Sequence, residues 1–471
     1  MEDKRVYKLN LVEIKKDFKF KPEDEIVQGA YNLKHKHCNK IKILPYTTKK
    51  ENIVLLFNGV IGAFFRMVCN KKLKSTFVVE EFIDNVTEEI GEFEDENTRK
   101  SFRNIIQTMF INNDKLIDFD IKTINYIEAS TYEESIAEFL FSLFMDDELK
   151  ILINKLYNKE TNNILKRLVL NTLPNLEDSE IKIKEYKCYI PFIKELFKKD
   201  FMFLISNEEL YKNSIQRFLE YYNMFYISQL SMKLSQFEKA DLNNPDPLYY
   251  TLNWESTSKN RTAYRFGFEK IKKSISTLYS HAITLEMLNY HNLNKQLGYV
   301  EIFELTKADS NANIKEDIKN LIEEYKNRIC DIKWEEEKEI ERTYSNEIFD
   351  MIYKLYDAIN FQFIKSKGNR NDLYNNYKNW AIKFIEKNFG KARGSLGYNL
   401  NLTEEDIILL TKICINKKLK LKVSVLFEEF EKRGIWFDRD SKTRIIQLYE
   451  KLNLLEKKSD SGDAQYVKSV L

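Results

Sequence analysis

The 471-residue sequence has few of the residues that end helices. Its 12 glycines and 6 prolines make up about 4% of the chain, roughly a third of their usual share. Few turn-forming residues mean few turns, so we expect a mainly α protein with long helices. Hydrophobic residues make up 43% of the chain, which is enough for a globular core and excludes a disordered chain.

The sequence also has no large excess of either charge. Its 75 Lys and Arg residues face 73 Asp and Glu residues, which leaves a net charge of +2. This balance excludes a protein that binds nucleic acid through a globally positive surface. Any contact with nucleic acid must therefore be local.

Paired cysteines and targeting segments are missing too. The five cysteines are scattered, without a C-x-x-C pair, as expected for reduced thiols in the cytoplasm. The first ten residues lack the apolar core of a signal peptide. Asn58 and Arg66 interrupt the most apolar run, residues 52–69, which is too short to span a membrane. We expect a cytoplasmic protein with no membrane segment, in which this run is a buried helix.

Sequence motifs for catalysis are not found. The chain has no G-x-x-x-x-G-K-[ST] phosphate-binding loop. The cluster HKHC at residues 35–38 has no second pair of ligands at the spacing of a metal site. IDFDIK, residues 117–122, resembles a D-x-K nuclease strand, but such triplets arise by chance in a chain this rich in Lys and Asp. We expect a non-enzymatic protein that requires no metal or other cofactor.

Helical periodicity covers most of the chain and suggests four parts. In residues 130–157 we predict a helix that Thr131 caps, with Glu134 completing a capping box. Residues 313–364 are long enough for two helices or one extended arm. We predict an elongated multi-helix body with these domains: an N-terminal helical domain at 1–170, a central helical domain at 171–364, a basic helical linker at 365–395, and a winged-helix domain at 396–471.

The linker has a local excess of positive charge. Eight basic residues face two acidic ones between 365 and 395, a local net charge of +6, and five aromatic residues lie among them. Such a stretch can bind nucleic acid through phosphate contacts and stacking, or it can be an amphipathic connecting helix with solvated lysines. The candidate DNA-binding residues here are Lys378, Lys383, Lys387, Lys391 and Arg393.

The last seventy residues predict three helices followed by a β-hairpin. Thr403 caps the first helix, Gly434 ends the second, and Asp440 or Ser441 caps the third. Two strands joined by a turn at residues 460–463 follow, with Gly462 suited to the positive φ of a tight turn. This pattern is typical of a winged helix, whose third helix enters the major groove of DNA.

The predicted DNA-binding residues of this domain are Lys442, Thr443, Arg444, Gln447, Lys451, Lys457 and Lys458. Asp460 and Asp463 in the turn would repel phosphate, so a protein-docking role for the domain stays open.

Two further segments carry concentrated charge. Residues 253–270 gather Lys259, Arg261 and Arg265 where a loop enters a helix, which attracts anions but also fits a capped helix entry packed on Trp254. Residues 80–96 hold nine acids and no base, as in a solvated helix face or a docking surface for a basic partner.

Three segments of the sequence resemble a known family. RGSLGYNLNLTEEDIILLTKICI, the stretch from LFEEFEKRG to the C-terminus, and NWESTSKNR are similar to DptG, also called DndG. DptG is a component of the DNA phosphorothioation-dependent restriction system. The resemblance implies an accessory subunit that works with the ATPase subunit DptF and the ATPase/helicase-like subunit DptH to restrict DNA without phosphorothioate marks.

Together these observations predict a non-catalytic subunit of an anti-phage restriction complex that contacts double-stranded DNA. The alternative is a scaffold whose winged helix binds a partner protein instead of DNA.

Overall fold

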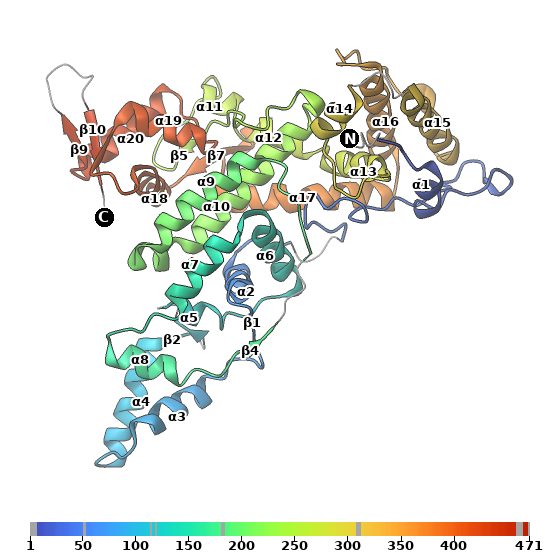
Figure 1. Ribbon diagram of the computed structural model, residues 1–471. Coiled ribbons are helices and arrows are strands. Elements are labelled where there is room, and N and C mark those ends of the chain that lie inside the picture. Colours follow the sequence, from blue (N-terminus) through green and yellow to red (C-terminus); the bar gives the residue numbers. More distant parts are fainter. Residues whose placement is uncertain are drawn as a thin grey trace, which may run out of the picture.

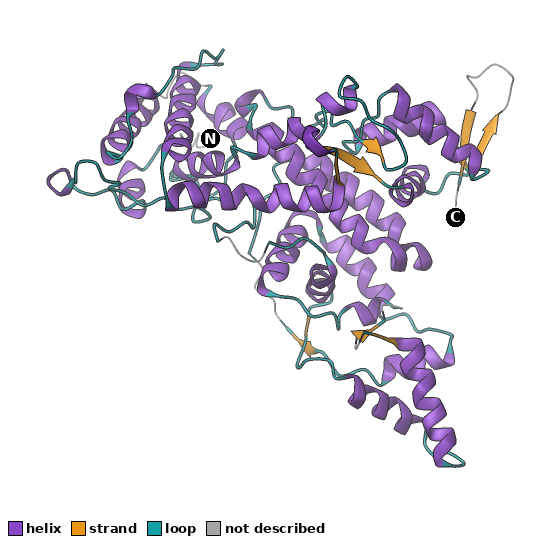
Figure 2. Ribbon diagram, turned by 180° about the vertical axis from the view of Figure 1, so that it is seen from behind, coloured by secondary structure: helices purple, strands orange, loops and turns teal. Residues whose placement is uncertain are grey.

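The computed structural model describes residues 7–49, 53–113, 115–117, 120–179, 184–307, 312–457 and 465–469. These residues are mostly helical, with a few small sheets, as the sequence predicts. Figure 1 and Figure 2 show an elongated molecule with three arms. One arm ends at α3 and α4, the second at α1 and α15, and the third at α20 and the strands β9 and β10.

The N-terminal part folds around α2. All residues of α2 from Gly59 to Val68 are buried, so this part of the apolar run is a core helix as predicted, whereas residues 53–57 are not helical. The buried Arg66 donates to the carbonyls of Asn125 and Ile127 at 2.9 and 2.5 Å. The helices of this part are α1 (Leu11–Asp17), η1 (Glu23–Glu25), α2 (Asn58–Val68), α5 (Ile121–Ile124), α6 (Thr131–Phe144) and α7 (Asp147–Tyr157).

A small separate core forms the end of one arm, which we call the tip. Its buried residues are Phe82, Ile83, Val86, Ile106, Phe110 and Val169, and they form a cluster distinct from the main core. The tip consists of α3 (Val79–Ile90), α4 (Glu96–Phe110), α8 (Ile164–Asn171), and the paired strands β2 (Ile111–Asn112) and β3 (Lys115–Leu116). At its base, β1 (Lys71–Lys72) pairs with β4 (Glu177–Asp178). The acidic run of residues 80–96 lies on this tip.

Helix α10 (Glu208–Leu234) forms the centre of the molecule. Every residue from Phe218 to Leu234 is buried, as expected for a helix that is covered on all sides. The other helices of the body are α9 (Pro191–Ile205), η2 (Phe237–Lys239), α11 (Thr262–Arg265), α12 (Phe268–Ile275), α13 (Leu278–Leu288), α14 (Tyr299–Thr306), α15 (Ala312–Arg328), η3 (Trp334–Glu336), α16 (Glu347–Lys365) and α17 (Asn369–Phe389). Of these, α9, α12, α13 and α17 pack on α10. Residues 313–364 therefore form two helices, with α15 packed on α16.

A three-stranded sheet connects this body to the last part of the chain. Strand β7 (Tyr398–Leu402) pairs in parallel with β5 (Thr251–Leu252) and antiparallel with β6 (Gly390–Ala392), and η4 (Gly394–Leu396) lies between β6 and β7. This sheet was not predicted from the sequence. Because β5 lies about 150 residues before β7, no local pattern joins them.

The described residues 403–457 and 465–469, the terminal unit, contain three helices and a second sheet. They are α18 (Glu404–Ile415), β8 (Lys420–Lys422), α19 (Val423–Lys432), α20 (Arg439–Lys451), β9 (Leu455–Lys457) and β10 (Gln465–Lys468). The sheet has the order β8-β10-β9 and is antiparallel throughout. The sequence predicted β9 and β10 but not β8. The predicted turn at 460–463 and Lys458 lie outside the described residues.

Two predicted helix caps are wrong by a few residues. Ser130, not Thr131, caps α6 and forms the capping box with Glu133. Asp438, not Asp440 or Ser441, caps α20 by accepting from the Ser441 N–H at 3.0 Å. The cap of α18 is as predicted, with a capping box between Thr403 and Asp406.

Candidate nucleic-acid interface

Helix α20 turns its predicted contact residues to solvent. Its inner residues Ile445, Leu448 and Tyr449 are buried in the main core. Because an α-helix has 3.6 residues per turn, these three residues mark one face, and residues about two positions away from them in the sequence lie on the opposite face. The exposed residues there are Thr443, Arg444, Gln447, Lys451 and the acidic Glu450.

Two of these exposed side chains contact each other. Arg444 Nη1 donates to Gln447 Oε1 at 3.1 Å, one turn along the helix. The contact holds an arginine fork and an amide side by side on the outer face of α20. Arg439, which the sequence analysis did not single out, is also exposed at the start of this helix.

Two of the predicted lysines are partly neutralised. Lys442 is half-buried, pairs with Glu431 at 3.2 Å, and lies 5.1 Å from the centre of the Phe427 ring. Lys457 pairs with Glu450 at 2.7 Å. The positive surface of α20 and β9 is therefore mixed with acidic groups.

Three predicted segments meet beside the start of α20. Lys391 donates to the carbonyl of Asn253, and Arg393 Nη2 donates to Thr257 Oγ1 at 3.1 Å. The same loop carries Arg261, which binds Asp438 at the N-terminus of α20. Segments that are more than 130 residues apart in sequence thus form one surface, on which Lys259 and Arg265 are exposed.

Arg261 itself is held by acidic neighbours. Its guanidinium binds both carboxylate oxygens of Asp438, at 2.5 and 2.9 Å, and also pairs with Glu255 at 3.3 Å. Burial opposes the charge of Asp438, but Arg261 and the Ser441 N–H outweigh it and lower the pKa of this carboxyl. Arg261 therefore fastens the N-terminus of α20 to the loop, and its fork is not left for a phosphate.

The aromatic residues of the basic linker face inward. Tyr374, Tyr377, Trp380, Phe384 and Phe389 on α17 are all buried, so they are closed to stacking with bases. Lys383 and Lys387 are exposed. Lys378 lies 4.9 Å from the centre of the Tyr374 ring, and burial followed by repulsion from Lys272 lowers its pKa. This helix can offer phosphate contacts through its lysines, but not base stacking.

The residues that suggested other chemistry have structural partners. The ring nitrogens of His35 contact the hydroxyls of Tyr31 and Tyr325, and burial lowers its pKa to about 3. Asp120 caps the short helix α5, so IDFDIK does not continue as a strand at this position. No group of three or more His, Cys, Asp or Glu residues suited to a metal occurs among the described residues.

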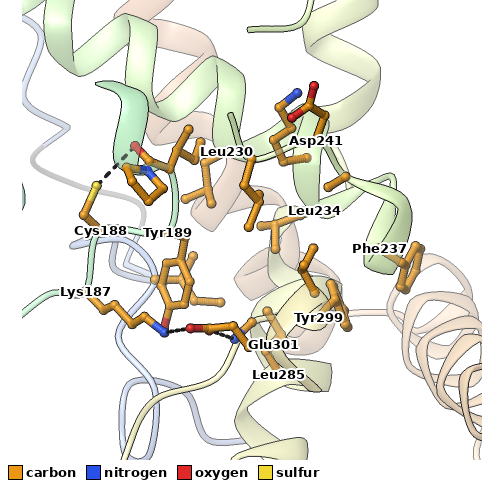
Figure 3. Close-up of a pocket in the computed structure, with 18 of the residues that line it drawn as sticks. Lys187, Cys188, Tyr189, Leu230, Leu234, Phe237, Asp241, Leu285, Tyr299 and Glu301 are labelled. Atoms are coloured by element: carbon orange, nitrogen blue, oxygen red, sulfur yellow. Dashed lines mark hydrogen bonds and ion pairs between the residues drawn. The ribbon is translucent and has the colours of Figure 1, made fainter. Parts of the chain in front are cut away.

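A mainly apolar pocket of about 480 Å³ lies between α9, α10, α13 and α14. Figure 3 shows Leu230, Leu234 and Leu285 in its wall. The polar groups at its edge are already bonded: Lys187 pairs with Glu301, and Cys188 Sγ donates to a carbonyl at 3.4 Å. Nothing predicted from the sequence lies in this pocket.

Comparison with known proteins adds no assignment. The chain matches no protein-family model, and it has no detectable similarity to the curated proteins with which it was compared. No helix in the described part of the chain is both long and apolar enough to cross a membrane.

Proposed function

We propose that residues 396–471 form a winged-helix domain that holds double-stranded DNA. The order helix–strand–helix–helix–strand–strand and the sheet order β8-β10-β9 support this assignment. In helix-turn-helix domains the recognition helix lies in the major groove, with its outward side chains against the bases. Here that helix is α20.

The exposed pair Arg444 and Gln447 is the observation that carries the proposal. An arginine fork matches the acceptors of guanine, and a glutamine amide matches adenine. Their mutual hydrogen bond restricts both side chains before DNA binds, which lowers the entropy cost of binding. Thr443 and Lys451 on the same face suit neighbouring phosphates.

The surface beside α20 extends this contact. Lys259 and Arg265 are exposed on the loop and on α11, while Lys391 and Arg393 bind the same loop. These four cations would contact phosphates without reading the sequence. Arg261 is left out of this surface because Asp438 holds its guanidinium.

We place this DNA-binding chain, on the basis of its resemblance to DptG, in a phosphorothioation-dependent restriction complex. It would act there as a non-catalytic subunit in the cytoplasm. The partners would be DptF and DptH, and the target would be DNA without phosphorothioate marks. The three resembling segments include the loop at 253–261, the helices α18 and α20, and α19 from Leu426 onward.

Fluorescence anisotropy with the full chain and a labelled duplex tests the DNA contact. Arg444→Glu combined with Lys451→Glu should weaken binding about 30-fold or more, because two contacts of about 1–3 kcal/mol each are lost. Lys16→Glu combined with Lys34→Glu makes the same change in net charge on exposed residues of another arm and should bind as the unaltered chain does. Equal loss in both variants, or no loss in the first, would contradict the proposal.

The mixed charge of α20 and β9 favours a second candidate, a scaffold that docks a protein partner there. Its observations are the pairs Lys442–Glu431 and Lys457–Glu450 and the exposed Asp440. Co-purification with DptF and DptH separates the two functions. If Arg444→Glu with Lys451→Glu releases a partner but leaves DNA binding unchanged, the scaffold is the function of this surface.

A further inference from the structure

A wide polar cleft lies next to the apolar pocket described above, and Lys187 lines both. It has a volume of about 890 Å³, at the upper end of the range for ligand pockets. Its walls come from α6, α7, residues 185–187, residues 289–296 and Lys40. None of these residues belongs to the proposed DNA surface, and Figure 1 places α6 and α13 away from α20.

Lysines dominate the charge of this cleft. Its charged lining residues are Lys40, Lys150, Lys187, Lys295 and a single acid, Glu185. Ser142, Asn289, Asn294 and Gln296 add neutral polar groups. A cleft lined by one sign of charge focuses the electric field and raises the local concentration of ions of the opposite sign.

The lysines differ in how far they are neutralised. Lys40 pairs with Glu13 at 2.5 Å and Lys187 with Glu301, and both acids lie outside the cleft. The only ion pair of Lys150 in the described part of the chain is a long one of 3.5 Å with Asp147, which is 94% exposed, and its ammonium lies 5.2 Å from the centre of the Phe141 ring. The side chain of Lys295 is exposed and makes no ion pair with any residue in the described part of the chain. Lys150 and Lys295 therefore carry the least compensated charge.

The pKa of His291, in the same wall, is affected by the positive charge of the lysines. Its pKa is lowered first by burial, and then by repulsion from Lys295 and, more weakly, from Lys40. Its Nδ1 accepts from the Leu293 N–H at 3.0 Å, which holds this side of the ring against the loop. Because the lowered pKa favours the neutral form of His291, the lysines are the groups that would bind an anion.

We propose that this cleft binds a small molecule that carries two or more phosphate groups. Ammonium groups spread over several walls suit a ligand with several negative charges, and hydrogen bonds between charged groups are stronger than neutral ones. The aromatic side chains Phe141 and Tyr186 in the wall are buried, so the site recognises the phosphates and not a stacked base. This proposal does not depend on the DNA-binding function.

Isothermal titration calorimetry at low ionic strength, with the full chain, tests the cleft with inorganic triphosphate, ATP and adenosine. Triphosphate and ATP should bind with similar affinity, and adenosine should not bind. Lys150→Gln combined with Lys295→Gln should weaken triphosphate binding about tenfold or more, because two charge-assisted contacts are lost. Lys150→Arg with Lys295→Arg keeps the charge and should still bind.

Two controls separate this site from the rest of the molecule. Lys16→Gln with Lys34→Gln removes the same charge elsewhere and should leave triphosphate binding unchanged. The Arg444→Glu, Lys451→Glu chain should also bind triphosphate normally. The proposal is overturned if triphosphate does not bind, if the Lys150/Lys295 variant binds as well as the unaltered chain, or if the α20 variant loses binding. Complete competition by a short duplex would instead assign the cleft to nucleic acid.

Discussion

The terminal unit and the tip lie on different arms, and they are attached to the molecule in different ways. The terminal unit shares the main core, which includes residues from Tyr7 to Val467. The tip has a small core of its own. One carries the exposed cations of α20, and the other carries the acidic run of residues 80–96. The basic surface is thus built on the main core, while the acidic surface is on a part with its own core, which we expect to unfold separately.

Three arginine–aspartate pairs fasten the terminal unit. Arg433, the C-cap of α19, binds both carboxylate oxygens of Asp200 on α9, each at 2.7 Å. Arg217 of α10 binds Asp406 at 2.6 and 2.9 Å, in the first turn of α18. The third pair is Arg261–Asp438 at the start of α20. All three are bidentate, which fixes orientation as well as distance. DNA bound on α20 would therefore be held in a fixed orientation to the body.

Breaking the most buried of these pairs should have the largest effect. Arg433 and Asp200 are 0% and 1% exposed, and Tyr222 donates to the same carboxylate at 2.6 Å. In Asp200→Asn the guanidinium loses its fully buried counter-charge and keeps only the pair with Glu429 at 2.9 Å, so the free energy of unfolding should fall by about 3 kcal/mol. Urea unfolding followed by circular dichroism measures this loss.

An apolar replacement of both partners serves as the control for that pair. Asp200→Leu with Arg433→Met removes both charges at similar volume and should recover most of the stability. If Asp200→Asn unfolds at the same urea concentration as the unaltered chain, the pair does not fasten the terminal unit.

A matched pair of core substitutions tests whether the two regions unfold separately. Phe430 in the terminal unit and Phe82 in the tip are 0% and 1% exposed, and replacing either by Ala should cost about 3–5 kcal/mol locally. Phe430→Ala should lower the main unfolding transition. Phe82→Ala should leave that transition unchanged and make Arg99, Lys100 and Arg103 of α4 accessible to trypsin. If both variants shift the main transition equally, the tip is not a separate unit.

The main core also buries a carboxyl group whose effect depends on pH. Glu286 is fully buried and accepts from the backbone N–H groups of Asn39, Lys40 and Ile41 at 2.7 to 3.3 Å. Burial raises its pKa from 4.5 to about 7, although these hydrogen bonds oppose the shift. The folded chain then keeps this proton between about pH 4.5 and 7, where the unfolded chain releases it.

The stability from this proton is fully present below about pH 4.5 and is lost as the pH rises through about 7. The loss should be at most about 1.4 kcal/mol per pH unit. Unfolding of the unaltered chain and of Glu286→Gln at pH 5 and pH 7.5 measures it. Because Gln does not titrate, the stability of the unaltered chain relative to Glu286→Gln should fall from pH 5 to pH 7.5. A pH-independent difference would contradict the shift. Among the described residues of α3 and α4, no carboxyl group is buried, so trypsin cleavage of the tip should not follow this trend.

Local features of both regions could be predicted from the sequence, and long-range ones could not. The capping box of Thr403, the helices α18 to α20 and the strands β9 and β10 depend on residues close together in the chain. Arg433 and Asp200 are 233 residues apart, and no pattern in one segment indicates the other. For the same reason, the pairing of β5 with β7 and the contact between Arg393 and Thr257 could not be predicted.

Two features of the candidate site were only partly predicted from the sequence. The aromatic residues Tyr374, Tyr377 and Phe384 recur at helical spacing, which indicates a buried face and not a stacking surface. Lys272 follows Ile271 on an amphipathic helix, so its exposure was predictable, whereas its position next to Lys378 on α17 depends on packing. Charge composition therefore located the basic segments, but only the fold shows which cations are left unpaired.

The smallest expected effect belongs to the arginine of the tip. Arg103 pairs with Glu80 at 3.1 Å and with Asp84, whose side chains are 74% and 52% exposed. Ion pairs at such exposed positions contribute about 0–1 kcal/mol, because water screens them and both side chains lose freedom. Arg103→Ala should therefore leave the urea transition unchanged and barely alter trypsin cleavage elsewhere in α4. A loss as large as that of Asp200→Asn would mean that burial does not set the strength of these pairs, and the contrast between the fastened terminal unit and the separate tip would then fail.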